Sequence, residues 1–244
     1  MNSNVSKIAV VAGVGEGIGL AVSRRFAKEG FLTVMLARNE KKVDEFAQSI
    51  RAQGGKAVGL KTDLREESEI TSTLRRIEAE MGPIDAAIYN AGAAHRMPAL
   101  EITGDTFEKV WRLGCFGAFV FGRESIRHML PRGRGTLLFT GATASLRGGA
   151  NFSAFAAAKF GARAVTESLA REFGPQGIHV ATVIIDGAVD MPAIHRRMPD
   201  LAKSAPPDGL LNTDAIADTY FMLHSQRRSA WTLQADLRPY SERF

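Results

Sequence analysis

The sequence predicts an α/β fold, with helices covering both faces of one parallel sheet. Short apolar runs alternate with amphipathic segments along the whole chain, which is typical of strands joined by helical crossovers. Several runs are apolar on both faces, as strands are when helices cover both sides of a sheet. The chain has 244 residues, 45% hydrophobic and 23% charged, which suits a single domain over residues 1–244.

About seven strands are predicted, and the last is expected at an edge of the sheet because Pro239 follows it. The predicted strands are Ile8–Ala12, Leu32–Ala37, Ala57–Lys61, Ala86–Tyr89, Thr136–Thr140, His179–Ile185 and Trp231–Leu237. Apolar residues recur at helical spacing between them, for example at Ile70, Leu74 and Ile77.

A glycine-rich turn joins the first strand to the first helix and is the most informative feature of the chain. Gly13, Gly15, Gly17 and Gly19 follow the strand, and Ile18 opens a helical apolar pattern. A strand, a glycine turn and a helix in this order are typical of dinucleotide binding, because the helix N-terminus directs free N–H groups at the phosphates. The predicted sheet is therefore a doubly wound sheet of the Rossmann type.

The stretch around 188–212 lacks a clear periodic pattern and contains four prolines. It follows the sixth predicted strand at its carboxyl end, where ligands bind in such sheets. A long connection there is typical of a substrate lid. A surface excursion without a binding role is the alternative.

Composition limits the classes of partner. The net charge is +5, but the basic residues form scattered pairs, which favours an anionic cofactor over nucleic acid. Cys115 is the only cysteine and lies in an apolar stretch, so we expect a core residue in a reducing compartment. No apolar run is long enough for a membrane span, and no cluster has metal-ligand spacing. We expect a cytoplasmic protein with no metal and no membrane partner.

Four motifs, taken together, resemble the short-chain dehydrogenase/reductase family over nearly the whole chain. They are the glycine turn, Asp63-Leu64, Asn90-Ala91-Gly92, and the segment from Phe155 to Lys159, which departs from the family's Tyr-x-x-x-Lys only in its first residue. The resemblance implies a nicotinamide dinucleotide cofactor, hydride transfer with a small-molecule substrate, and a homodimer or homotetramer.

The cofactor half of this resemblance is largely intact. Arg38 follows the second strand, where a guanidinium suits the 2′-phosphate of NADP(H), so NADP(H) is favoured over NAD(H); a solvated surface arginine is the alternative. Glu16 argues the other way, because it adds negative charge to the glycine turn. The family pattern assigns adenine contact to Asp63 and Leu64, and a turn along the cofactor to Asn90, Ala91 and Gly92. Ala12 replaces a frequent threonine that cross-links these turns.

The catalytic half departs from the family pattern. Lys159 is present, but Phe155 stands at the tyrosine position, Ala142 at the serine position and Gly114 at the asparagine position. A phenyl ring cannot transfer a proton. Asp186-Gly187 replaces the usual Pro-Gly after the sixth strand and places a carboxylate near the expected nicotinamide position.

Several other residues offer a proton donor in place of the family's tyrosine. His95 follows the Asn90 turn and has a suitable ordinary pKa, although a surface histidine is the alternative. Asp186 is an acid or base if burial raises its pKa, or else a structural carboxylate. Thr143 and Ser145 offer hydroxyls near the serine position, and Tyr89 is expected to be a packed aromatic residue.

Two functions remain open from the sequence. The first is an NADP(H)-dependent oxidoreductase with an altered catalytic set. The second is a non-catalytic NADP(H)-binding protein on the same fold, since function resides in the site. The large residues Trp231, Tyr240 and Phe244 near the chain end indicate either a subunit interface or packing on the chain's own core.

Overall fold

The computed structural model describes residues 7–242 and contains one seven-stranded sheet. All strand pairs are parallel, in the order β3-β2-β1-β4-β5-β6-β7. The strands are β1 (Ile8–Ala12), β2 (Leu32–Ala37), β3 (Lys56–Lys61), β4 (Ile84–Tyr89), β5 (Gly135–Ala142), β6 (Ile178–Ile185) and β7 (Gln234–Leu237). The predicted fold class is confirmed, and β7 is the edge strand that Pro239 predicted.

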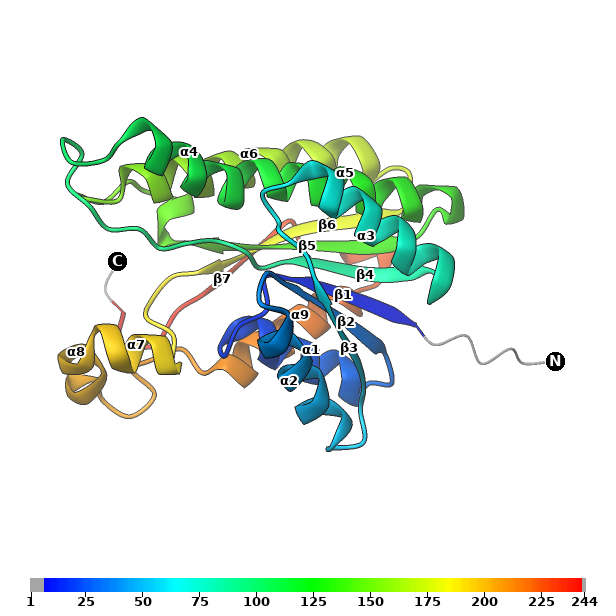
Figure 1. Ribbon diagram of the computed structural model, residues 1–244, viewed down its shortest axis with the longest axis horizontal. Helices are drawn as coiled ribbons and strands as arrows, with labels where there is room; N and C mark the ends of the chain where they lie inside the picture. Colours follow the sequence, from blue (N-terminus) through cyan, green and yellow to red (C-terminus); the bar gives the residue numbers. More distant parts are fainter. Residues whose placement is uncertain (1–6, 243–244) are drawn as a thin grey trace.

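Helices cover both faces of the sheet (Figure 1). On one face lie α1 (Ile18–Lys28), α2 (Glu40–Arg51) and α9 (Thr213–His224). On the other lie α3 (Glu67–Glu80), α4 (Gly104–Trp111), α5 (Gly117–Met129) and α6 (Ser153–Phe173). A π-helical turn, Arg112–Phe116, joins α4 to α5. Short 3₁₀ turns occur at Leu130–Arg132, Thr143–Ser145 and Arg228–Ala230.

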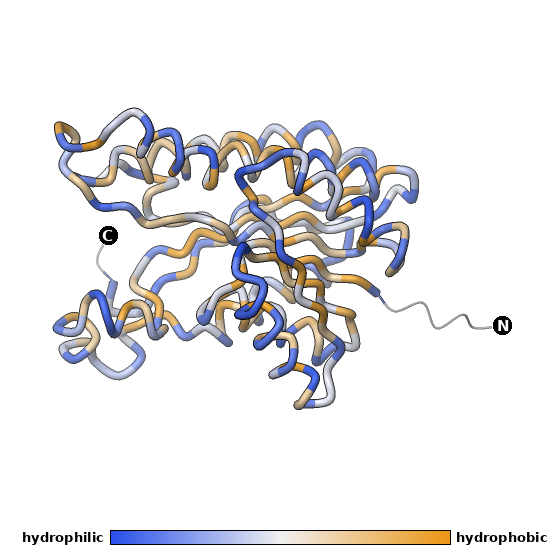
Figure 2. The backbone as a smooth tube through the Cα atoms, in the orientation of Figure 1, coloured by the Kyte–Doolittle hydropathy of each residue, from blue (hydrophilic) through white to orange (hydrophobic). Residues whose placement is uncertain are grey.

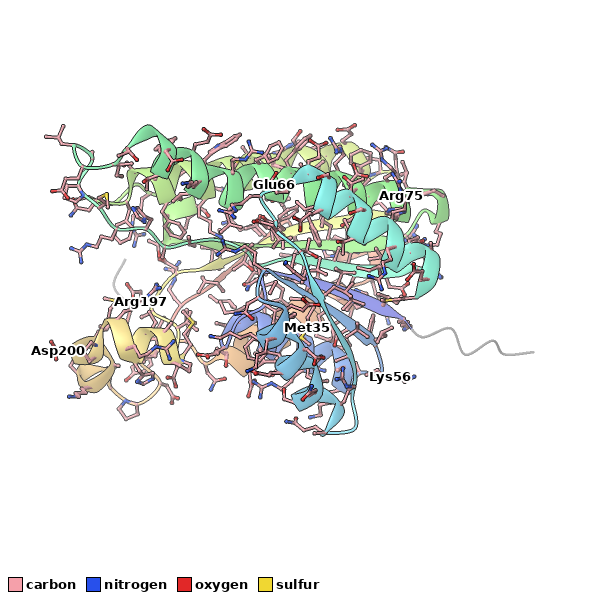
Figure 3. All side chains as sticks on the ribbon, in the orientation of Figure 1. Met35, Lys56, Glu66, Arg75, Arg197 and Asp200 are labelled. Carbon is pink, nitrogen blue, oxygen red and sulfur yellow. The ribbon has the colours of Figure 1, made fainter. Side chains whose placement is uncertain are left out.

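The core forms two apolar layers, one on each side of the sheet. All five residues of β1 and all eight of β6 are buried, as the two-sided apolar pattern predicted. Figure 2 shows the apolar strands in the interior and polar residues on the outer helix surfaces. Met35 of β2 points into the layer under α1 and α2 (Figure 3). This packing fixes the strand register, and the register sets where the loops that follow the strands lie relative to one another.

The segment 188–212 is more regular than the sequence indicated. It contains two short helices, α7 (Pro192–Arg197) and α8 (Pro199–Ser204). A proline stands at the start of each helix, where its missing N–H has no cost and its fixed φ suits the first turn. Pro192 and Pro199 therefore begin helices, whereas the prolines of this stretch predicted irregular chain. Both helices lie beside the carboxyl ends of the strands, with Arg197 and Asp200 on their outer surface (Figures 1 and 3).

Candidate active site

The motif residues gather at one edge of the sheet. The carboxyl ends of β1, β4, β5 and β6 meet there because all the strands are parallel. The chain leaves β1 towards β2 on one side and continues from β4 on the other, so the sheet changes winding direction between β1 and β4. Ligands bind at such a switch point in open α/β sheets.

The glycine turn passes closely under the loop after β4. Gly13 has φ +84°, and a Cβ atom there would lie 2.5 Å from the Ala91 amide nitrogen. The Gly13 amide donates to the Leu36 carbonyl at 2.9 Å. Any side chain at this position would be strained by the backbone conformation and would collide with Ala91. The turn is thereby held against both neighbouring strands.

The N-terminus of α1 is suited to an anion. Gly17 is its N-cap and supplies no side-chain cap, and the first turn carries no acidic residue. Its amides are therefore open to an external acceptor such as a pyrophosphate. Glu16, whose charge in the glycine turn disfavours NADP(H), faces Arg196 of α7 at 3.5 Å, so that arginine offsets its charge. The Met191 sulfur lies 2.6 Å from where a Gly17 Cβ would be, so the 188–212 segment touches the turn.

The residues expected at the adenosine end lie beyond β2 and β3. Exposed Arg38 borders an open hollow of about 650 Å³, together with the cations Lys41 and Lys61 and the carboxylates Glu40 and Asp44. Asp63 is engaged within the chain, because Arg65 Nε donates to its Oδ1 at 3.0 Å. That hydrogen bond is the main reason that the pKa of Asp63 is lowered.

Asn90 supplies the cross-link that Ala12 cannot make with its side chain. Its Nδ2 donates to the Gly13 carbonyl at 2.9 Å, and its backbone amide donates to the Ala12 carbonyl at 2.8 Å. The side chain of Thr140 donates to Asn90 Oδ1 at 2.9 Å. The loop after β4 is thus fixed to both the glycine turn and β5.

Lys159 of α6 reaches the same point from the helical layer. Its side chain is buried, and Nζ donates to the Thr140 carbonyl at 2.7 Å. Burial lowers the pKa of Lys159 to about 8. Nζ lies 5.9 Å from the centroid of the Phe155 ring, and a Gly92 Cβ would be 3.1 Å away from it. Lys159, Phe155 and Gly92 are therefore neighbours.

Gly114 lies in the π-helical turn that leads into α5. A Cβ at Gly114 would lie 2.7 Å from Ala158 Cβ of α6, so the two helices approach too closely there for a larger residue. The adjacent Leu113 carbonyl accepts a hydrogen bond from the Tyr89 hydroxyl at 2.6 Å. Burial raises the pKa of Tyr89, which fits a packed phenol and not a proton donor.

Asp186 is a buried carboxylate at the end of β6. Thr143 Oγ1 donates to its Oδ1 at 2.6 Å, and Arg147 and Arg238 lie 3.7 and 3.5 Å from its oxygens. Two cations and one hydroxyl therefore surround this buried carboxylate. No local pattern in the sequence predicts the role of Arg238, because only the pairing of β6 with β7 brings it near Asp186.

The other substitute donors differ in their surroundings. Ser145 is buried, and its Oγ accepts a hydrogen bond from the Ala142 amide at 3.1 Å, so it supports the strand end. His95 is partly exposed, and within residues 7–242 its enclosed Nε2 has no hydrogen-bond partner. Ala142 and Phe155 are both partly exposed at the carboxyl edge.

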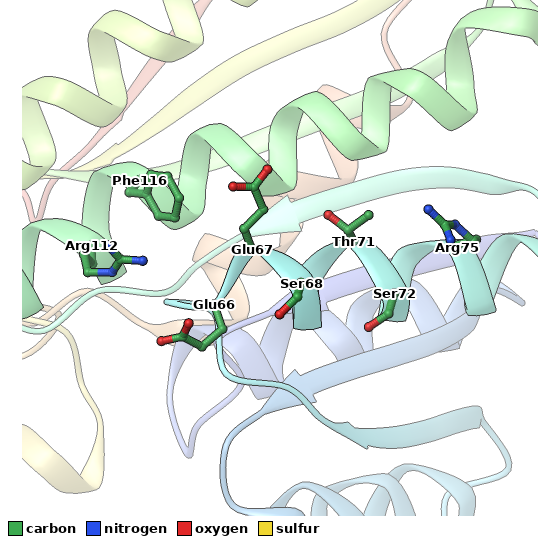
Figure 4. A pocket seen from close by; sticks show the side chains of 8 residues that line it. All are labelled: Glu66, Glu67, Ser68, Thr71, Ser72, Arg75, Arg112 and Phe116. Atoms are coloured by element: carbon green, nitrogen blue, oxygen red, sulfur yellow. The ribbon is translucent and has the colours of Figure 1, made fainter.

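A second hollow lies away from these residues. It has a volume of about 560 Å³ on the outer surface of α3, between Glu66 to Arg75 on one side and Arg112 and Phe116 on the other (Figure 4). It contains none of the motif residues. In the described part of the chain, His, Cys, Asp and Glu side chains form no group of three or more that could hold a metal ion, and no helix has the length and apolarity to cross a membrane.

Two of the three C-terminal aromatic residues lie in the described part of the chain, and their surroundings differ. Trp231 stacks on His179 of its own chain, with ring centroids 4.9 Å apart. Tyr240 is 76% exposed. Phe244 lies outside the described residues. Trp231 therefore packs on its own chain.

Comparison with known proteins identifies relatives of this chain. Residues 7–199 match the family model for short chain dehydrogenases. The cis-4-hydroxycyclohexanecarboxylate dehydrogenase of Sinomonas cyclohexanicum is 28% identical, with 91% of each chain covered. A short-chain dehydrogenase structure from Rhodopseudomonas palustris is 42% identical, with a TM-score of 0.83 over 97% of this chain and 100% of that one.

A more distant structure shares the fold alone. A variant of the actinorhodin polyketide ketoreductase, solved with NADPH, is 23% identical, with a TM-score of 0.89 over 98% of both chains. The family model covers most of the chain, and the parallel sheet with its glycine turn agrees with it. The chain therefore belongs to the short-chain dehydrogenase/reductase family, whose members are oxidoreductases that use NAD(P) cofactors.

Proposed function

We propose that this protein is an NADP(H)-dependent oxidoreductase with a reduced catalytic set. The environment of Lys159 carries the proposal. A buried ammonium group is costly unless polar groups surround it, and the Thr140 carbonyl is its one hydrogen-bond acceptor among the described residues. A ribose hydroxyl pair beside Lys159 would satisfy its remaining donors. When bound, the nicotinamide would supply or accept the hydride.

We propose the remaining cofactor contacts at the same carboxyl edge of the sheet. The open first turn of α1 would hold the pyrophosphate, with Gly13, Gly15, Gly17, Ile18 and Gly19 forming the turn. Asn90, Ala91 and Gly92 would lie along the cofactor, and Asp63 and Leu64 would border the adenine. Asp186 and Gly187 would lie near the nicotinamide.

Preference for NADP(H) rests on the charges around Arg38. Its guanidinium shares an open hollow with Lys41 and Lys61, and a 2′-phosphate there would meet three cations. A guanidinium gives a phosphate fixed, charge-assisted donors. Glu40 and Asp44 line the same hollow, but Asp44 lies 3.5 Å from Arg51, which reduces its effect on a bound phosphate.

The catalytic set is proposed to be reduced because Phe155, Ala142 and Gly114 occupy the family's tyrosine, serine and asparagine positions. General acid catalysis contributes roughly 10²- to 10⁴-fold to rate, and one oxyanion donor roughly 10²- to 10³-fold. We therefore infer a substrate that accepts hydride with little help from a protein acid, such as an activated alkene or an imine. Asp186 and His95 are the substitute acid–base groups to test.

The segment 188–212 is proposed to act as a lid over the substrate. It touches the glycine turn through Met191 and the Arg196–Glu16 pair, so its contacts would change when a cofactor enters. Loops in this place commonly close over substrate and exclude water.

A non-catalytic NADP(H)-binding protein is the second candidate function. The absence of a hydroxyl at both Phe155 and Ala142 favours it. It shares the cofactor contacts with the first candidate and differs only in chemistry. Binding measurements alone therefore cannot separate the two candidates.

Stopped-flow oxidation of bound NADPH against ketones, quinones, enones and imines tests the proposal. Fluorescence titration first gives the dissociation constants of NADPH and NADH. Turnover of any class above the rate without protein, lost in Lys159→Ala, supports an oxidoreductase. Tight NADPH binding without turnover of any class supports the binding protein. Absence of binding by either cofactor contradicts both.

We also propose that the chain forms a homodimer or homotetramer. Four aromatic side chains, each 37–42% exposed, project from neighbouring helices α4, α5 and α6; they are Phe107, Trp111, Phe119 and Phe160. Exposed aromatic residues of this kind are enriched at subunit interfaces. Light scattering should show a closed assembly, and Trp111→Glu with Phe160→Glu should dissociate it. A monomeric parent at micromolar concentration would contradict the assembly.

A further inference from the structure

Tyr220 connects the far side of the sheet to the candidate site. It lies in α9, is fully buried, and belongs to none of the motifs. Its hydroxyl lies 2.6 Å from Thr140 Oγ1 of β5. The backbone carbonyl of the same threonine accepts the hydrogen bond from Lys159 on the opposite helical layer. Thr140 is therefore contacted from both faces of the sheet.

The direction of every hydrogen bond in this network follows from one fixed acceptor. The Gly13 carbonyl can only accept, so the Asn90 amide must turn its Nδ2 towards Gly13. Asn90 Oδ1 then faces Thr140 and accepts the single hydroxyl proton of that residue. Thr140 Oγ1 has no proton left for Tyr220, so the Tyr220 hydroxyl must donate to it.

The chain of bonds thus runs one way, from Tyr220 to Thr140, to Asn90 and to the Gly13 carbonyl. Burial raises the pKa of Tyr220, so its phenol stays protonated and remains a donor. A Cβ at Gly19 would lie 3.1 Å from Asn90 Nδ2, which shows that the amide sits against the first turn of α1. The network therefore ends at the turn that would hold the pyrophosphate.

We propose that Tyr220 is a positioning residue: its hydroxyl, acting through Thr140 and Asn90, fixes the glycine turn in the conformation that binds the cofactor. This inference rests on the proposed function. Ala12 cannot cross-link the turn through its side chain, so the turn depends on the Asn90 amide, and that amide depends on a donor at Thr140. Without Tyr220, the Thr140 hydroxyl would lose its own donor and rotate more freely.

Tyr220→Phe tests this, because it removes one hydroxyl and keeps the ring. We expect NADPH affinity to fall by roughly five- to tenfold, about the factor that one net hydrogen bond supplies. Hydrogen exchange of a peptide covering residues 11–20 should also be faster in the cofactor-free variant. Tyr89→Phe is the matched control, since it removes another buried phenol hydroxyl, whose one hydrogen-bond partner within residues 7–242 is the Leu113 carbonyl. It should lower the melting temperature without changing NADPH affinity or turn exchange.

Two variants of the intermediate residue complete the experiment. Thr140→Ser keeps the hydroxyl and should bind NADPH as the parent does. Thr140→Val should reproduce the loss of NADPH affinity and the faster turn exchange of Tyr220→Phe. The double variant Tyr220→Phe, Thr140→Val should bind NADPH no more weakly than Thr140→Val alone. These variants also serve if Tyr220→Phe does not fold. Parent-like NADPH affinity and turn exchange in folded Tyr220→Phe and Thr140→Val would overturn the inference. A parent that binds neither cofactor overturns the proposed function instead, and the exchange measurement still reports whether Tyr220 holds the turn.

Discussion

Restoring two hydroxyls should create a carbonyl reductase on this scaffold. The double variant Phe155→Tyr, Ala142→Ser places a phenol beside Lys159 and a hydroxyl at the end of β5. Both positions are partly exposed, so neither new hydroxyl is forced into a dry interior. Gly114 remains, and on the proposed assignment the family's asparagine role is still missing, so the recovery should be partial.

The distance from Lys159 to the Phe155 ring sets the size of the effect. Taking the 5.9 Å from Nζ to the ring centroid as the order of the separation from the new phenolate, the two charges interact by about 3 kcal/mol at an effective dielectric constant of about 20. This corresponds to about two pKa units and would bring the new phenol from about 10 to about 8. A phenol with that pKa acts as an acid near neutral pH, and we expect a gain of roughly 10²-fold or more in kcat/KM.

The assay is NADPH-dependent reduction of a reactive α-diketone by parent, single and double variants. Reduction needs the protonated phenol, so the gained rate should fall as the pH rises above about 8. Phe152→Tyr is the control, because its ring lies 6.4 Å from that of Phe155, outside the contact with Lys159. A folded double variant that binds NADPH and reduces no carbonyl faster than the parent would refute the reasoning. If the parent already reduces the diketone as fast as the double variant, another residue supplies the proton. Asp186→Asn and His95→Ala are then the next variants to test.

Three further predictions concern the cofactor, the fold and its dependence on pH. Arg38→Ala should weaken NADPH binding by roughly 10- to 150-fold and leave NADH nearly unchanged, since only NADPH carries the 2′-phosphate; equal losses in a fluorescence titration would contradict this. Gly114→Asn should lower the melting temperature, because its Cβ would lie 2.7 Å from Ala158 Cβ, and Ala158→Gly in the same chain should restore part of the loss. Burial lowers the pKa of His224 to about 4, so the unfolded chain binds a proton there that the folded chain excludes, and stability should fall as the pH drops from about 6.5 to about 4 by at most about 3 kcal/mol. Urea denaturation at several pH values measures this, and an unchanged pH dependence in His224→Gln would show that other groups cause it.

The positions of the strands in this protein could be predicted from local patterns of apolar residues. The seven strands lie where the apolar runs predicted them, with small shifts at their ends and a shorter β7. A strand that is buried on both faces is a continuous run of apolar residues, so adjacent positions in the sequence are enough to predict it. The residues that follow the strands lie at one edge of the sheet, because the carboxyl ends of parallel strands meet there.

The contacts between distant segments could not be predicted from such local patterns. Tyr220 meets Thr140 across 80 positions, and Thr140 meets Asn90 across 50. Arg238 approaches Asp186 only because β7 pairs with β6. Such contacts depend on strand order and helix placement, so no local pattern encodes them. The same holds for Gly114: the motif spacing predicts it at the family's asparagine position, but only the close approach of two helices shows that a larger residue there would collide with Ala158.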